Sequence, residues 1–263
     1  MTTPHEVDVP ETLQAITRRL DDTQDLLEAA VQHLSTLETR LKRHDYAIND
    51  LHWDAARILS SDNPKAATTP EGHQTLRAVQ DGSDQLVQDL RTSAAAASTG
   101  HTLLTSAGRQ LGHAQRLIGE LGDLGDLGDV GGEALATEVA VLATRTERLA
   151  TLVESAIPLA ERAQQQLGQA QEILQRQASA GTPPEADRFQ RFWAVDVGIF
   201  DGSRAVAQAR TTTRDGAELL ERAVHTGTLT AVQARSTLRQ HTPLPRHEPP
   251  PSLGPVGPAG PSI

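Results

Sequence analysis

The sequence predicts an all-α protein: a long antiparallel four-helix bundle with coiled-coil-like packing and a disordered, proline-rich C-terminal tail. Apolar residues recur every seven residues over long stretches, and breaker-rich segments divide these stretches into four. Sustained heptads of this kind indicate helices that pack side by side. More than half of the 15 prolines fall within residues 242–263, and such a segment builds no core. We expect a flexible N-terminus over residues 1–9, the bundle over 10–241 and the tail over 242–263.

The first helix is predicted over residues 10–60, where two seams of side chains run for six heptads. One seam contains Leu13, Leu20, Leu27, Leu34, Leu41 and Ile48, and the other contains Ile16, Thr23, Ala30, Leu37, His44, Leu51 and Ile58. Leu26 and Val31 flank the seams and widen the apolar stripe. A wide stripe favours at least three packed helices over an isolated two-stranded coil.

The second helix is predicted over residues 70–121, with small residues in the middle of its seams. The seams contain Leu76, Ser83, Leu90, Ala97, Leu104, Leu111 and Ile118, and Val79, Leu86, Ser93, Gly100, Ala107, Ala114 and Leu121. Small side chains let helices approach closely, although each interior glycine costs about 1 kcal/mol relative to alanine. Gly108 and Gly112 lie one turn apart, and we expect them to form such a close contact.

The third and fourth helices are predicted over residues 133–178 and 184–240. The third has one unbroken seam: Leu135, Val139, Leu142, Thr146, Leu149, Val153, Ala156, Ala160, Ala163, Leu167, Ala170 and Leu174. In the fourth, Phe192, Ile199, Val206, Thr213 and Leu220 keep phase, as do Ala217, Val224, Ala231 and Leu238. The pairs Asp201-Gly202 and Asp215-Gly216 resemble turns, so this helix either shifts phase or breaks in two.

Local signals at the predicted helix starts agree with these ranges. A Pro-Glu pair occurs at residues 10–11, 70–71 and 184–185. Proline suits the first helical position, and a nearby carboxylate complements the positive end of the helix dipole. Thr69 is expected to cap the second helix. The short linkers can join antiparallel neighbours, in a rod of about 70 Å.

Composition removes several classes of chemistry. Without cysteine the chain has no disulfide, no thiolate nucleophile and no Cys-ligated metal. Its start lacks the features of a secretory signal, and no window approaches the roughly 18 apolar residues of a membrane span. We therefore expect a cytoplasmic protein and leave non-classical export open. The excess of arginine over lysine is typical of GC-rich, actinobacterial-like genomes.

The charge is acidic overall and uneven along the chain. A net charge of -10 disfavours nonspecific binding to nucleic acid. Residues 204–247 nevertheless carry seven arginines against three acidic residues. We interpret this basic segment as a solvated helix face; the alternatives are pairing with the acidic body of the chain and binding of an acidic partner.

No catalytic motif stands out, and we expect neither an enzyme nor a cofactor or metal. The inward Glu-x-x-His pairs of di-iron bundles, the zinc-protease motif and the phosphate-binding loops are missing from the sequence. An enzyme with a site between helices, using His44 or His52, remains an alternative. The repeat of aspartates at residues 122–129 is interpreted as an acidic hairpin in preference to a calcium site.

His44 is a polar residue on an apolar seam. Such residues usually set helix register or oligomeric state, and a metal-binding or pH-sensing role is the alternative. His33 and Glu38, like Arg40 and Asp45, have the five-residue spacing of charge pairs between helices, either within the chain or between copies.

The aromatic residues are few and unevenly placed. The chain has six: Tyr46, Trp53, Phe189, Phe192, Trp193 and Phe200. In an up-down-up-down bundle the first helix ends where the fourth begins, so all six are expected at one end. They form either a thick local core or a surface that contacts a partner.

These observations favour a non-catalytic helical-bundle scaffold that acts by homo-oligomerisation or by binding a protein partner. The alternative is a secreted or membrane-acting bundle, such as an exported effector or a pore-former, whose aromatic end contacts a membrane surface.

Overall fold

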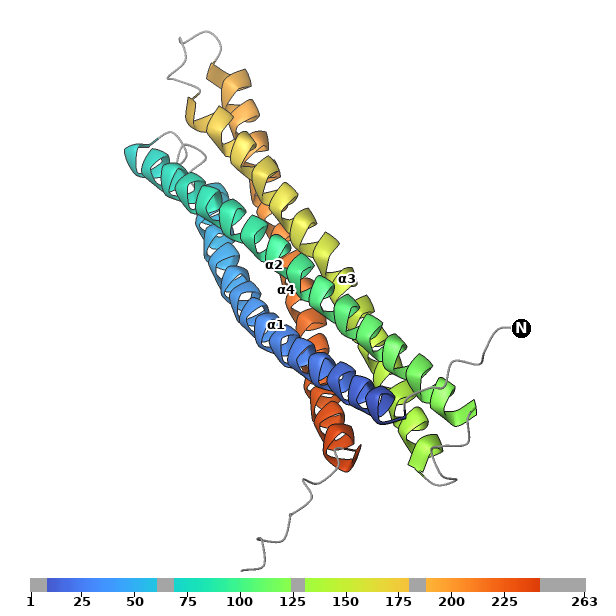
Figure 1. Cartoon of the computed structure of the whole chain (residues 1–263). Helices are drawn as coiled ribbons and strands as arrows, with labels where there is room; N and C mark the ends of the chain where they lie inside the picture. The colour runs from blue at the N-terminus through green and yellow to red at the C-terminus, as the bar shows by residue number, and fades with distance from the viewer. Residues whose placement is uncertain (1–8, 61–68, 124–130, 180–187, 242–263) are drawn as a thin grey trace, which may run out of the picture.

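The computed structural model describes residues 9–60, 69–123, 131–179 and 188–241; within them, a few side chains near helix ends, and all those of residues 188–200, are not described. The four helices are α1 (Val9–Ser60), α2 (Pro70–Asp123), α3 (Gly131–Ser179) and α4 (Arg188–His241). Each helix packs against two others, in the ring α1–α2–α3–α4 (Figure 1). The four-helix bundle predicted from the heptads is confirmed.

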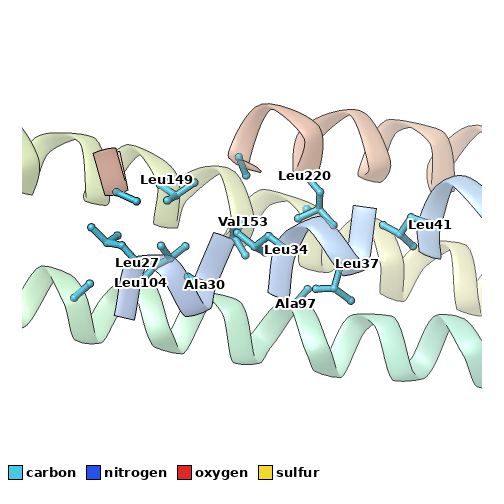
Figure 2. Packing of buried hydrophobic residues seen from close by; sticks show 14 of the residues in the cluster. Leu27, Ala30, Leu34, Leu37, Leu41, Ala97, Leu104, Leu149, Val153 and Leu220 are labelled. Carbon is cyan, nitrogen blue, oxygen red and sulfur yellow. The ribbon is translucent and has the colours of Figure 1, made fainter. Parts of the chain in front are cut away.

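Leucine, valine and alanine side chains from all four helices meet along the axis of the bundle (Figure 2). Leu27, Leu34 and Leu104 are fully buried there. Every predicted seam position of α2 is buried, and so is every predicted α3 position whose side chain is described. Leu13 is an exception on α1: its side chain is 41% exposed, because it lies near the first turn, at the end of the bundle.

The predicted glycine contact in α2 is wrong. A Cβ atom added to Gly108 or Gly112 would meet nothing within 4 Å, because these glycines lie beside the buried seam and not on it. The close approach occurs instead at Gly100, where an added Cβ would be 2.9 Å from Cδ2 of Leu34. Gly100 was predicted as a seam position, and its close contact with Leu34 agrees with that position.

The start of α2 has the predicted cap. The hydroxyl Oγ1 of Thr69 accepts a hydrogen bond of 3.0 Å from the backbone N–H of Gly72. The carbonyl oxygen of Thr69 accepts a second bond, of 2.9 Å, from the N–H of His73. The cap satisfies an N–H group that the first turn would otherwise leave unpaired, and so fixes where α2 begins.

α4 is one continuous helix through both predicted turn pairs, and its buried face differs from the expected one. Val206, Thr213 and Leu220 are buried as expected. Of the second expected seam, Ala217 and Ala231 are buried and Val224 and Leu238 are half-buried. The buried face is wider than expected, because small side chains one residue earlier are buried as well: Ala209, Gly216, Ala223, Thr230 and Thr237. Gly216 lies within 3.7 Å of leucine side chains of α1 and α3, measured from an added Cβ. Asp215-Gly216 is therefore part of the helix and not a turn, and Gly216 is in ordinary van der Waals contact with its neighbours.

Ion pairs join the last helix to the first. Arg210 Nε lies 3.4 Å from Asp45 Oδ1, Lys42 Nζ lies 3.4 Å from Glu221 Oε2, and Arg235 pairs with Glu28. Hydrogen bonds from Gln24 and Arg235 lower the pKa of Glu28. Part of the basic segment of the sequence thus pairs with acidic residues of the same chain.

Toward the end of the bundle where α2 begins and α3 ends, these two helices diverge (Figure 1). Within the described residues, no helix has an apolar stretch long enough to cross a membrane.

Candidate functional site

A groove of about 780 Å³ runs between α1 and α2. It is lined by Arg40, Arg43, His44, Ala47, Asp50 and Leu51 of α1, and by Gly82, Gln85, Leu86, Asp89 and Thr92 of α2. Gly82 shapes its floor: a Cβ atom there would be 2.8 Å from Cδ2 of Leu51, so the absence of a side chain lets Leu51 lie against α2. Arg40, Arg43 and Asp50 of α1 and Asp89 of α2 surround this apolar floor.

His44 lies at the inner wall of the groove, on the seam where the heptad predicts it. Its side chain is buried, and Nε2 lies 3.4 Å from the hydroxyl of Ser93, a seam residue of α2. Burial lowers the pKa of His44 below 6.5; the carboxylate of Asp89 opposes this effect and the guanidinium of Arg40 adds to it. A neutral imidazole that faces a hydroxyl favours the one register of α1 against α2 in which the two groups meet. This agrees with the expected role of His44 in setting helix register.

Tyr46 and Trp53 lie on the outer face of α1, with side chains 72% and 65% exposed. Tyr46 follows Arg43 by three residues and precedes Asp50 by four, so on a helix it neighbours both of these groove residues. Trp53 follows Asp50 by three. The ring of Trp53 also contacts the imidazole of His52, with centroids 6.0 Å apart and planes tilted by 59°. Both aromatic side chains thus lie on the exposed face of α1 next to the groove residues Arg43 and Asp50, and outside the lining of the groove itself.

The other predicted aromatic site residues, Phe189, Phe192, Trp193 and Phe200, are helical in α4, but their side chains lie outside the described part. The end of α1 and the start of α4 share one end of the bundle (Figure 1). His52, next to Trp53, nevertheless lies beside Ala207, Arg210 and Arg214 of α4. A single cluster of six aromatics therefore stays a prediction.

The two histidines considered for an inter-helix site do not face one another. His44 points toward α2, whereas His52 lines a pocket with α4. In the described ranges, no three His, Asp or Glu side chains gather as a metal site requires. Most of the aspartate repeat at 122–129 lies outside the described residues.

The residues considered for pairing between copies mostly bind within the chain. Nε2 of His33 lies 2.7 Å from the carbonyl oxygen of Ala96, Glu38 pairs with Lys42, and Asp45 pairs with Arg210. Arg40 instead lines the groove.

Sequence reasoning missed the groove and its charged rim. The available signal was the charge pattern of α1, where Arg40, Arg43 and Asp50 follow one flank of the seam. Comparisons with protein families, with characterised proteins and with solved structures found nothing that matches this chain.

Proposed function

We propose that this chain is a non-catalytic helical-bundle protein that acts by binding a protein partner at the outer edge of α1 and α2, and that a second copy of the chain is the first candidate partner. The observation that carries the proposal is the exposure of Tyr46 and Trp53 beside the α1–α2 groove. Tyrosine and tryptophan are the side chains that most often dominate protein interfaces when they become buried.

The groove has the dimensions and chemistry for a helix of a partner. From Arg40 to Leu51 it follows α1 for about 16 Å at ~1.5 Å per residue, which equals about three turns of a docked helix. Ala47, Leu51 and Leu86 provide apolar surface to bury. Helix-in-groove binding combines such an apolar floor with a polar rim.

The charges at the rim support a second copy as the partner. Arg40 and Arg43 lie on the same surface as Asp50 and Asp89, so the patch carries both signs. In a two-fold contact the same patch meets itself, and the arginines of one copy can then face the aspartates of the other. A patch of one sign would repel its own copy.

The proposal is tested by mass and shape in solution, using light scattering and small-angle X-ray scattering. We expect a mass that is a multiple of 28.1 kDa, which the double variant Tyr46→Ala/Trp53→Ala reduces to that of one chain. The matched control is Leu229→Ala/Val232→Ala, which removes two exposed apolar side chains from α4 and should leave the mass unchanged. A native chain that stays monomeric up to high micromolar concentration contradicts self-assembly.

Vesicle flotation tests the membrane-acting alternative on the same variants. Native chain that floats with anionic vesicles, and the aromatic double variant that does not, would support a membrane contact instead of a protein contact.

A further inference from the structure

A second, smaller pocket lies between α1 and α4 and is rich in cationic groups. It has a volume of about 130 Å³ and is lined by His52 of α1 and by Ala207, Arg210, Thr211 and Arg214 of α4. Arg210 and Arg214 are one helical turn apart on the same face of α4, so both side chains line the same pocket. None of the five lining residues is acidic, in a chain whose net charge is -10.

Both arginines have hydrogen-bonding capacity left. Arg210 approaches Asp45 through Nε at 3.4 Å, but Asp45 Oδ1 has no hydrogen-bond partner within the described ranges, so this contact is an ion pair without good hydrogen-bond geometry. Arg214 makes no ion pair or hydrogen bond with any residue that the structure describes. A guanidinium presents five N–H donors in a planar fork, which suits an oxyanion.

His52 adds a polar group that the fold leaves unsatisfied. Its ring nitrogen Nδ1 is buried and lacks a hydrogen-bond partner among the described residues. An unpaired buried polar atom costs free energy, and native structures rarely retain one without a reason. Because His52 lines the pocket, its imidazole lies beside any anion that binds there. The hydroxyl of Thr211 donates to the carbonyl of Ala207 at 3.2 Å, so the donors of the pocket are the two guanidinium groups and the imidazole.

We propose that this pocket binds a tetrahedral oxyanion of the phosphate class, held by Arg210 and Arg214 with His52 as a third contact. Its volume is well below the roughly 300–1,000 Å³ of pockets for drug-sized ligands. It therefore fits an inorganic anion, or the phosphoryl group of a phosphomonoester whose remainder stays outside. Paired arginines bind such groups through short, charge-assisted hydrogen bonds.

Isothermal titration calorimetry on the full chain tests the proposal, with inorganic phosphate, sulfate and O-phosphoserine as probes in a non-phosphate buffer. We expect saturable binding of phosphate, and a loss of affinity of about tenfold or more for Arg214→Gln, because one charge-assisted contact disappears. Arg222→Gln is the matched control: it removes the same charge from an exposed position on α4, where Arg222 pairs only weakly with Glu218, and should change the affinity less than about twofold. Circular dichroism verifies that both variants remain folded.

The outcomes separate clearly. Phosphoserine binding tighter than inorganic phosphate assigns the pocket to the phosphoryl group of a larger molecule, whereas equal affinities assign it to a free anion. The absence of saturable binding for every probe up to about 10 mM overturns the proposal. Equal losses of phosphate affinity in Arg214→Gln and Arg222→Gln also overturn the proposal, because they would reflect the overall electrostatic potential of the chain and not contacts in the pocket.

Discussion

Gly227 of α4 lies so close to Val31 of α1 that a Cβ atom at position 227 would be 2.6 Å from Cγ2 of Val31. Leu149 of α3 crowds the same position from another direction, with Cδ2 at 3.1 Å. The glycine thus lies where α4 touches both of its neighbours in the ring. A β-branched valine has little rotational freedom with which to give way.

We predict that Gly227→Ala lowers the free energy of unfolding by about 1–3 kcal/mol, because overpacking outweighs the gain in helix propensity of about 1 kcal/mol. Urea unfolding followed by circular dichroism measures the change. Gly108→Ala is the control: its added Cβ meets nothing, so it should stabilise by up to about 1 kcal/mol. Similar stabilisation by both substitutions would mean that α4 does not approach α1 this closely.

Two leucines on the same predicted seam should differ greatly in their contribution to stability. Leu34 is fully buried among side chains of the other helices (Figure 2), whereas Leu13 is largely exposed. Leu34→Ala should cost about 2–5 kcal/mol, since it removes buried surface and leaves a cavity. Leu13→Ala should cost less than about 1 kcal/mol. Equal losses in denaturant titrations would place Leu13 in the core.

Acid should destabilise the protein partly through His44. Its pKa is lowered in the folded state by burial, so below about pH 6.5 the unfolded chain takes up a proton that the folded chain does not. The free energy of unfolding therefore falls as pH falls through this range. In His44→Leu this contribution should disappear, and the stability difference between the native chain and the variant should change with pH.

The matched control for His44 is the exposed His113 of α2, replaced by glutamine. His113→Gln should keep the pH dependence of the native chain in the same unfolding titrations. A pH dependence that survives in His44→Leu would assign the acid sensitivity to other groups.

The hydroxyl of Thr237 is buried and has no hydrogen-bond partner in the part of the chain described, whereas that of Thr213 donates to the carbonyl of Ala209 at 2.8 Å. Thr237→Val removes an unsatisfied polar atom and keeps the shape of the side chain. We expect it to be about 1–2 kcal/mol more stable than Thr213→Val, which loses a hydrogen bond. Thermal unfolding of the two variants measures the difference. A melting temperature of Thr237→Val below that of Thr213→Val would indicate that the hydroxyl of Thr237 makes a hydrogen bond in the native chain.

The sequence predicted α1, α2 and α3 well because their buried faces consist of residues that heptad patterns recognise. Large apolar residues such as Leu27 and Val139 recur at the seam positions of these helices, and both are fully buried. The second seam of α4 was predicted only in part. Ala217 and Ala231 are buried as expected, but the most deeply buried positions lie one residue earlier and hold glycine, threonine and alanine, which carry little hydrophobic signal. Val224 and Leu238, the larger residues that suggested the other phase, are only half-buried.

The candidate site was less predictable than the fold. His44 was recognised because it interrupts a seam, and Tyr46 and Trp53 because aromatics are rare in this chain. The groove and the cationic pocket depend on how neighbouring helices are offset, and a single helix pattern contains no information on that offset. Arg214, for example, becomes notable only once α1 brings His52 beside it.

The packing of the first helix against the last has a consequence for biosynthesis. A ribosome adds about 5–20 residues per second, so α1 leaves it well before α4 does and waits roughly ten seconds or more. During that interval the flank of α1 that later contacts Gly227 is uncovered. The nascent chain must keep this apolar surface from neighbouring polypeptides, and a chain that stops before α4 would keep it exposed permanently.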